Sequence, residues 1–520
     1  MFCGLFKKNK MILLVRKILF IGFISKFKSK KNLSFIDLNF RKNDFTNYHQ
    51  IRSFIFKKDF FKIKNKNIHN FDFLNFSKKL GGKIGINLSK DAIYSWYKIN
   101  KNRLGFPWSD DLTSKRLINL LYNYEYINSS SKLIDKKKLD LIIFKHIQRI
   151  IFEFNLKKIN EITSYDIVAY SLSSLIFKKF NIKDINYIKF IIENQVDKLG
   201  MHKTYNVLEH SKFINNINEL KNILLFFNIE KAKIFDDLLL KMTSVLNQYF
   251  HNDGSLPLFN GANNIYTKII YDSINKDFYY KKRNFDNVEN GIAFYSDKYK
   301  NIFFDVVQPN KDMISSNLSA GTLSLEISGF GEKIFTNCGA SENAGKNPEY
   351  LRYSAAHSTI ILQNTNISEI KEGNPHIKFP QSVVFRNDNN QNEEIFEGSH
   401  NGYLRKFNKI IKRKLIIFKN ENKLIGEDSF ISYKDIVGRL IFHIRFHLAE
   451  GMTFNFTNSK KNIILKTKLN NIWLFKSGME LIVEDSILVD NNITKPTKQI
   501  VIKGIITEKK AIKKWSLEKI

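Results

Sequence analysis

The chain is poor in the residues that define several protein classes. It has only 2 cysteines, 7 prolines and 23 glycines among 520 residues. Two cysteines, Cys3 and Cys338, exclude a disulfide-stapled scaffold and any cysteine-rich zinc or iron–sulfur site. So little proline and glycine excludes collagen-like and low-complexity chains. Hydrophobic residues make up 43% and charged residues 26%, a balance typical of folded proteins with sizeable cores.

A long apolar run is also missing. The best candidate, residues 11–27, is interrupted by Arg16 and Lys17. The uninterrupted run, residues 18–24, is far shorter than the ~20 residues that a spanning helix needs, so we expect no transmembrane helix. A basic start before an apolar run is typical of a secretion signal, but residues 25–27 make a poor cleavage site. The alternative is a basic leader.

Acidic residues are outnumbered, with 50 Asp+Glu against 83 Lys+Arg and a net charge of +33. Residues 1–70 alone carry 17 basic and 3 acidic side chains. One hypothesis is a compositional bias toward Lys, Asn, Ile and Phe, which gives a solvated basic surface. The other is attraction to a polyanion. Phenylalanines among the lysines of residues 54–61 are typical of single-strand stacking platforms, but the same bias explains them, and we expect no nucleic-acid partner.

The spacing of apolar residues predicts two architectures in succession. Between residues 110 and 250 apolar side chains recur every three or four positions, which is typical of amphipathic helices that pack as antiparallel hairpins. These positions are Leu139, Ile142, Ile143, Ile147, Ile150, Ile151 and Phe154; Ile217, Leu220, Leu224 and Phe227; and Leu238, Leu239, Met242, Val245, Leu246 and Tyr249.

After residue 290 the period becomes two. Phe442, Ile444, Phe446 and Leu448 alternate with polar side chains, and so do Leu323, Leu325 and Ile327. This predicts an antiparallel sandwich with one buried face per strand. Helices followed by strands predict two segregated domains joined within residues 252–290. We expect Gly329-Phe330-Gly331 to be a hairpin turn, residues 499–502 to be the last sandwich strand, and the lysine-rich end to be a solvated tail or helix.

Few motifs carry recognisable chemistry. There is no phosphate loop, no HExxH zinc helix and no G-x-S-x-G elbow. If residues 199–210 are helical, His202, Asn206 and His210 share one face, with Tyr205 and Glu209 beside it. Such a stripe lines a cleft or is a polar surface. His357 is expected at the entry to a strand. His443, Arg445 and His447 are expected on one strand face, as a basic strip or a solvated face.

A series of short segments after residue 90 occurs in an order that is specific, although each segment is weak alone. The segments are Trp96 with Arg103-Leu-Gly-Phe106-Pro-Trp108; Gly200-Met-His202; Asp253-Gly254-Ser-Leu-Pro-Leu-Phe259-Asn260-Gly261; Ala320-Gly321-Thr-Leu-Ser-Leu-Glu326; Thr336-Asn337-Cys-Gly339; Ala355-Ala-His357-Ser358-Thr359; His400-Asn-Gly402-Tyr403; Arg445-Phe-His447-Leu448; and Gln499-Ile-Val-Ile502. In these segments, which cover most of the chain after residue 90, the chain resembles the bacterial heparinase II/III-like proteins.

This resemblance implies an α+β multidomain protein, with an N-terminal α/α toroid of helical hairpins followed by a C-terminal antiparallel β-sandwich. We expect a basic leader in residues 1–70, the toroid in residues 71–285 and the sandwich in residues 286–520. The resemblance also implies a location in the cell envelope or periplasm, with the cytoplasm as the alternative because the signal segment is weak.

The activity that the resemblance implies is β-elimination in a uronic-acid-containing acidic polysaccharide. Removing the C5 proton builds negative charge beside a carboxylate, so the site must supply donors, a base and an acid. His202, Tyr205 and His357 are the expected catalytic residues, and Tyr249 is an alternative tyrosine. A larger group is expected to bind substrate: Asn206, His210, Arg445 and His447.

The chain departs from the family at its metal positions. Ser315, Asn317 and Asn337 stand where metal-binding relatives have ligands, and only His357 is kept. One imidazole and two amides make a poor zinc site, so we expect no metal and no cofactor. The alternative to a lyase is a catalytically degenerate glycan-binding envelope protein on the same fold. The sequence does not indicate the oligomeric state.

Overall fold

The fold is seen in a computed structural model of the chain. It describes residues 20, 66–103, 105–129, 131–177, 181–264, 267–268, 270, 291–309, 318–341, 349–371, 374–434, 438–490 and 493–520. Nearly all of the expected leader, most of the expected junction, and Ser315 and Asn317 lie outside these residues. The contacts define two compact units. The helical unit runs up to Asn194 and includes Lys212–Leu239, and the sandwich unit comprises Gln195–Ser211 and Leu240–Ile520.

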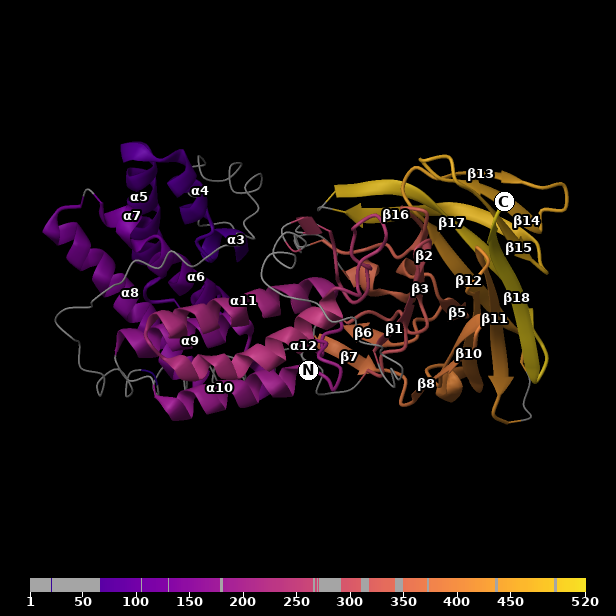
Figure 1. Cartoon of the computed structure of the whole chain (residues 1–520), viewed down its shortest axis with the longest axis horizontal. Helices are drawn as coiled ribbons and strands as arrows, with labels where there is room; N and C mark the ends of the chain where they lie inside the picture. The colour runs from indigo at the N-terminus through magenta and orange to yellow at the C-terminus, as the bar shows by residue number, and fades with distance from the viewer. Residues whose placement is uncertain are drawn as a thin grey trace, which may run out of the picture. The chain divides into compact units, whose positions relative to one another are not determined.

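The first half of the described chain is helical (Figure 1). Its helices are α3 (Lys66–His69), α4 (Phe73–Leu80), α5 (Gly82–Asn100), α6 (Asp110–Tyr122), α7 (Tyr124–Asn128), α8 (Leu133–Phe154), α9 (Ser164–Ile176), α10 (Ile182–Gln195), α11 (Val207–Phe226) and α12 (Asp236–Leu246). The three predicted stripes fall on α8, α11 and α12, and their central residues Leu139, Ile217 and Met242 are fully buried. The periodicity prediction is confirmed there. No described helix is long and apolar enough to cross a membrane.

A buried cation organises the helical unit. Arg116 of α6 has 0% exposure, and its guanidinium lies 3.9 Å from the ring centre of Trp96 and 5.0 Å from that of Trp108. It donates to His146 Nε2 at 2.7 Å and to the His69 carbonyl at 2.5 Å. Burial lowers the pKa of both Arg116 and His146. Trp96 and Trp108, which belong to the first of the matching sequence segments, therefore form an aromatic cage around Arg116.

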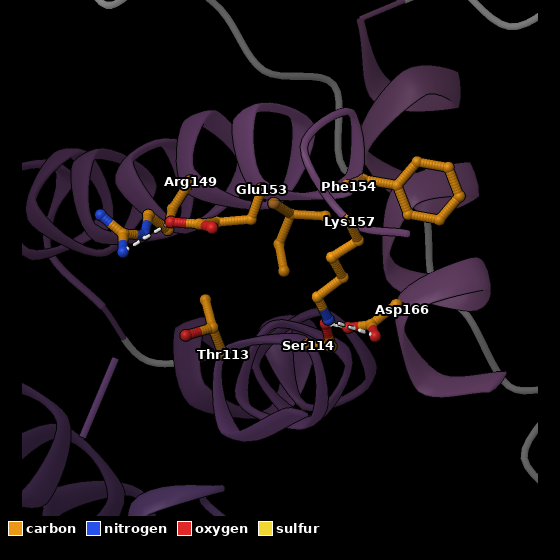
Figure 2. Close-up of a pocket in the computed structure, with 8 residues that line it drawn as sticks. Thr113, Ser114, Arg149, Glu153, Phe154, Lys157 and Asp166 are labelled. Carbon is orange, nitrogen blue, oxygen red and sulfur yellow. Dashed lines mark hydrogen bonds and ion pairs between the residues drawn. The ribbon is translucent and has the colours of Figure 1, made fainter. Parts of the chain in front are cut away.

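A polar cluster ties α6, α8 and α9 together (Figure 2). Asp166 accepts from Lys157 Nζ at 2.5 Å and from the Ser114 hydroxyl, and it closes a capping box with Thr163 at the start of α9. The cavity between these side chains has room for about 10 Å³, which is about one water. Because its carboxylate is already paired and the space is so small, we interpret this cluster as structural.

The second half folds into two eight-stranded antiparallel sheets. The first sheet has the order β1-β2-β3-β4-β12-β17-β16, with β5 paired to β12, and the second has the order β13-β14-β15-β18-β11-β10-β9-β8. The strands of the first sheet are β1 (Ile292–Ser296), β2 (Lys300–Asp305), β3 (Leu325–Gly329), β4 (Glu332–Thr336), β5 (Ile360–Leu362), β12 (Leu440–Leu448), β16 (Leu481–Asp490) and β17 (Ile493–Ile506). Those of the second are β8 (Val383–Asn389), β9 (Glu393–His400), β10 (Lys409–Phe418), β11 (Lys423–Ser432), β13 (Thr453–Phe456), β14 (Asn462–Lys466), β15 (Ile472–Ser477) and β18 (Lys510–Lys519). A small pair, β6 (Glu369–Lys371) and β7 (Asn374–Lys378), accompanies them.

The core lies between the two sheets (Figure 1). Phe446 of β12 contacts Phe475 of β15 and Trp515 of β18, with ring centres 5.0 and 4.7 Å apart. A helical region followed by an antiparallel two-sheet region confirms the predicted fold class. The predicted turn at Gly329–Gly331 is confirmed as well, since Phe330 and Gly331 connect β3 to β4 with φ of 55° and 81°.

Two strand predictions need correction. The last strand is β18, not residues 499–502, and it lies inside the second sheet between β15 and β11. Its inward residues Ala511, Trp515 and Leu517 are buried, while Lys510 and Lys514 lie at outward positions. The strip on β12 is not solvated either, because His443 and His447 are only 5% and 2% exposed.

Candidate functional site

The segment before α11 is a tight loop and not a helix, so the predicted helical face is wrong. The Asp197 carboxylate accepts the N–H groups of Leu199, Gly200 and Met201, each at 2.9 Å. Gly200 has a φ of 103°, and a Cβ there would lie 2.9 Å from Lys241 Cγ. A carboxylate that binds three consecutive amides, together with a left-handed glycine, stabilises a turn in place of helix.

The loop still brings two of the predicted residues together. The backbone N–H of His202 donates to His210 Nδ1 at 3.2 Å, and His210 Nε2 donates to the Met242 carbonyl at 3.0 Å. His202 Nδ1 lies 2.8 Å from the Thr204 hydroxyl. Burial lowers the pKa of His202 to about 4 and that of His210 to about 3. Both imidazoles are therefore neutral at pH 7.

Asn206 and Asn260 join this loop to the family-like segment of residues 253–261. Asn206 Nδ2 donates to the Asn260 carbonyl at 3.1 Å, and Asn260 Nδ2 donates to the Tyr205 carbonyl at 3.3 Å. Asn260 Oδ1 accepts from the amide of Ser319 at 3.2 Å. Asn206 Oδ1 also accepts from the amide of Glu209 at the start of α11. The side-chain amide of Asn206, a predicted substrate ligand, is thus hydrogen-bonded to the backbone of Asn260 and Glu209 and positions these segments.

Tyr205 and Tyr249, the two candidate tyrosines, line one small cavity of about 10 Å³ together with Asp197. Tyr205 has a left-handed backbone, with a φ of 48°. Burial raises the pKa of both tyrosines above the usual range. The Tyr249 hydroxyl donates to the Ile292 carbonyl at 2.7 Å. At neutral pH both phenols hold their protons, so either is suited to donate a proton and poorly suited to remove one.

Sequence analysis missed the most connected group of the sandwich unit, the Glu326 carboxylate. Its side chain has 0% exposure. Oε1 accepts from the Leu258 amide at 3.0 Å and from the amide and Nδ2 of Asn337 at 3.0 and 3.1 Å. Oε2 accepts from His251 Nε2 at 3.0 Å and Lys333 Nζ at 3.3 Å. Burial alone would raise its pKa, but Lys333 and His251 lower the pKa to about 2. The sequence did contain a signal for this group: Glu326 is an acidic residue between the apolar residues Leu325 and Ile327 of a predicted strand.

His357 lies next to this carboxylate network. Asn337 Oδ1 accepts from the amide of Ser358 at 3.0 Å, which fixes the backbone beside His357. A Cβ on Gly321 would lie 3.0 Å from the His357 ring, so only glycine leaves the ring its place. Within the described residues, neither ring nitrogen of His357 makes a well-formed hydrogen bond, but the Leu351 backbone is close enough to raise the His357 pKa, against the larger effect of burial. Burial lowers the pKa of His357 to about 4.

His447 and Arg445 continue the site along β12. His447 Nε2 donates to the Ala355 carbonyl at 3.0 Å, and its Nδ1 lies 2.7 Å from the Ser486 hydroxyl. Burial, assisted by His357 and Arg445, lowers the pKa of His447 to about 3. Arg445 Nη1 binds Glu484 Oε2 at 2.8 Å, while its Nε has no partner among the described residues. The predicted residues of the sandwich strands thus lie close together.

The described residues do not fit a zinc site. Asn337, which the resemblance implied as a metal position, has both ends of its amide engaged, by Glu326 Oε1 and the Ser358 amide. No three His, Cys, Asp or Glu side chains in the described part of the chain converge on one point.

Lowering the pH from 7 to 5 is expected to destabilise the protein. Five buried histidines have native pKa values of about 3 or 4, namely His202, His210, His357, His400 and His447. In the unfolded chain each titrates near 6.5, so the unfolded state binds more protons as the pH falls through 6.5, and folding stability is lost until about pH 4. At pH 5 each histidine lowers the free energy of unfolding by roughly 1–2 kcal/mol relative to pH 7.

Urea unfolding at pH 7 and pH 5 measures this effect. Glu326 does not mask it, because its lowered pKa favours the native state until the pH falls below about 4.5. Burial raises the pKa of Asp305 to about 7, so this carboxyl gains stability over the same range, but one group offsets about one of the five histidines. An unchanged unfolding midpoint between pH 7 and 5 would contradict the assignment of neutral buried imidazoles.

Comparison with known proteins identifies the fold. Residues 282–516 match the family model described as heparinase II/III-like, C-terminal. The structure resembles crystal structures of heparinase III (TM-score 0.71, 12% identity, 99% of this chain and 91% of that chain) and of the heparan sulfate lyase HepC from Pedobacter heparinus (TM-score 0.59, 14% identity, 99% and 91%). It also resembles the heparinase III BT4657 gene product (TM-score 0.66, 12% identity, 99% and 90%). No curated protein sequence matches the chain. These findings confirm the resemblance seen in the sequence: residues 282–516 match the C-terminal domain of the heparinase II/III-like family, and the chain has the fold of the heparinase III structures.

Proposed function

We propose that this protein is a polysaccharide lyase that cleaves a uronic-acid-containing acidic glycan by β-elimination. The observation that carries the proposal is His357. Buried imidazoles are nearly always hydrogen-bonded, yet within the described residues the ring of His357 has a loose backbone contact with Leu351 and no well-formed hydrogen bond. The ring lies within the family domain, and its backbone is fixed through Asn337 and Glu326. A neutral imidazole that is so weakly bonded, in a rigid setting, is suited to accept a proton from a ligand.

The elimination requires a base, an acid and a group that neutralises the uronate carboxylate, and the described residues are suited to these three roles. A neutral His357 takes the C5 proton, and the C5–H electrons form the C4–C5 double bond. The C4–O4 bond breaks, and O4 leaves with a proton from an acid such as the Tyr205 phenol. Arg445 has a free Nε that is able to neutralise the uronate carboxylate as charge develops. His202, Asn206, His210 and His447 stay proposed members of the site, with their backbone contacts suited to positioning.

A second candidate function is glycan binding without cleavage. One observation favours it: His202, His210 and His447 are at least nine-tenths buried and bonded within the protein. Groups committed in this way are suited to hold a shape and less suited to exchange protons. A protein of this kind would bind an acidic glycan and release no product.

An absorbance assay on a panel of acidic polysaccharides separates the two functions. Elimination creates a 4,5-unsaturated uronate, which absorbs in the ultraviolet. We expect absorbance to grow with the wild type and to fall at least about 100-fold in rate with His202→Ala, since general acid–base and positioning groups contribute on that scale. Thermal unfolding of the variant checks that it folds. Binding to a glycan with no absorbance growth on the whole panel would favour the non-catalytic function.

The resemblance also supports a location in the cell envelope, where acidic polysaccharides occur. The domain boundaries near residues 70 and 285 stay predictions, as does the role of the basic leader. Residue 285 and nearly all of the leader lie outside the described residues.

A further inference from the structure

The helical unit exposes apolar side chains at the starts of two helices. Of the large hydrophobic side chains in the described part of the chain, Ile134 and Ile84 are the most exposed, at 79% and 78%. Ile134 belongs to the first turn of α8, and Ile84 belongs to the first turn of α5. Burial of apolar area is favourable in proportion to the area removed from water, so exposed aliphatic side chains of this size are suited to contact a partner.

Neither isoleucine is an isolated exposed residue. On α8, Leu133 and Leu141 are 68% and 51% exposed. Ile134 and Leu141 are seven residues apart, which places them on one face of the helix. Leu80, the last residue of α4, is 47% exposed and precedes Ile84 by four residues. The exposed apolar side chains are therefore gathered in two short segments, and such clusters mark contact surfaces.

Lysines surround the apolar side chains of the first segment, where α4 ends and α5 begins. Lys78, Lys79 and Lys83 are all exposed, on either side of Leu80 in the sequence. Residues 73–90 contain no acidic residue. This segment thus combines exposed aliphatic groups with positive charge that no neighbour in the sequence balances.

The second segment, at the start of α8, has the same combination. Lys136 and Lys137 are exposed between its apolar side chains. The acidic side chains there are only half-buried neighbours, Asp135 and Asp140, and Asp140 accepts a hydrogen bond of 2.7 Å from the Tyr124 hydroxyl. The positive charge is therefore the more exposed of the two.

Tyrosine hydroxyls hold both segments in place. The Tyr126 hydroxyl of α7 donates to the Ser77 carbonyl in the last turn of α4 at 2.8 Å. A Cβ on Gly85 would overlap this hydroxyl, so only glycine fits beside it. The Tyr94 hydroxyl of α5 donates to the Asp135 carbonyl in the first turn of α8 at 3.1 Å. Both segments are thus fixed to α5 and α7, and their exposed side chains extend from a rigid base.

We propose that these two segments, residues 78–84 and 132–141, dock on an anionic lipid bilayer. Ile84 and Ile134 enter the boundary between headgroups and acyl chains, and the lysines contact the lipid phosphates. Exposed aliphatic side chains among lysines are the combination that holds a protein at such an interface. A soluble polyanion uses the lysines only, because it offers no apolar phase. The docking surface goes beyond the proposed lyase activity and does not depend on it.

Vesicle flotation with the full chain tests the proposal. The probes are vesicles of phosphatidylglycerol mixed with phosphatidylcholine, and vesicles of phosphatidylcholine alone. We expect saturable binding to the mixed vesicles and much weaker binding to the neutral ones. Ile84→Ser and Ile134→Ser should each weaken binding about tenfold through lost apolar burial. The double variant Lys78→Gln, Lys79→Gln should weaken it roughly 25-fold, since each lysine near an anionic surface contributes about fivefold.

Two matched controls lie in the sandwich unit. Leu469→Ser removes an aliphatic side chain that is 67% exposed, and Lys460→Gln, Lys461→Gln removes two consecutive exposed lysines. We expect both to bind within about twofold of the wild type, because charges distant from the bilayer are screened. Thermal unfolding of every variant checks that it folds.

Four outcomes overturn the proposal. The first is no saturable binding to the mixed vesicles, and the second is equal binding to both kinds of vesicle. In the third, the lysine variant loses binding while either isoleucine variant keeps it, which shows a polyanion site and no insertion. In the fourth, the controls lose as much as the test variants, which assigns binding to the net charge of the whole chain. A failed lyase assay on soluble glycans contradicts the proposed activity and leaves this docking surface standing.

Discussion

Replacing His357 by glutamine is expected to lower the rate of unsaturated-uronate formation by about 100- to 10,000-fold, the range in which general acid–base groups contribute. The neutral imidazole is the one buried ring in the candidate site whose two nitrogens both lack a well-formed hydrogen bond among the described residues. Glutamine keeps a similar volume and a hydrogen-bonding end but has no basic nitrogen. The measurement is initial rate against pH on the best substrate of the polysaccharide panel.

The control is the same substitution at His400. That ring is also buried, and its Nε2 also lacks a partner in the described part of the chain, but it lies at the end of β9 in the second sheet. We expect His400→Gln to keep the rate within a few-fold after correction for folded protein. If His357→Gln turns over at the wild-type rate, another group is the base and His357 is structural.

Replacing Asp428 by alanine is expected to lower the free energy of unfolding by about 3–5 kcal/mol, the usual cost of breaking a buried ion pair. Asp428 and Arg413 are both 0% exposed and meet in two hydrogen bonds of 2.7 and 3.0 Å. Trp515 Nε1 donates to Asp428 Oδ2 at 3.0 Å. Without the carboxylate, a buried guanidinium and an indole lose their acceptor.

Urea unfolding measures this loss of stability, and two further variants serve as controls. Glu397→Gln breaks the half-exposed pair with Lys412 and should cost at most about 1 kcal/mol. The double variant Arg413→Met, Asp428→Leu should cost less than Asp428→Ala, because it removes both charges. A loss below about 1 kcal/mol in Asp428→Ala would show that Arg413 finds another partner.

This ion pair also bears on the candidate site. Arg413 Nη1 donates to the carbonyls of Leu323 and Ser358, each at 2.9 Å. Ser358 follows His357 directly, and Leu323 precedes β3, the strand of Glu326. Residues of the second sheet thus hold the backbone beside the proposed base, so we expect Asp428→Ala to lower the lyase rate as well as the stability.

Local patterns were enough for much of the fold. Every third or fourth residue is apolar along α8, α11 and α12, and every second residue along β12, because those periods match the geometry of a helix and a strand. The same reasoning failed at two places. In residues 199–206 the Asp197 side chain and Gly200 stabilise a turn that periodicity does not reveal. In β18 the lysines at outward positions resemble a solvated tail, and only the sheet shows that Trp515 and Leu517 face the core.

The sequence by itself determined the order of helices and strands and, through ordered motifs, the resemblance to the heparinase II/III-like proteins, which the family model matches in residues 282–516. It also pointed to His202, His357 and Arg445 as residues of interest. Only the tertiary structure decided their chemical states. Whether an imidazole is neutral, or a carboxylate such as Glu326 is charged, depends on desolvation and on partners distant in the chain, such as His251 and Lys333. Those contacts exist only once the sheets and loops have packed, and no local pattern encodes them.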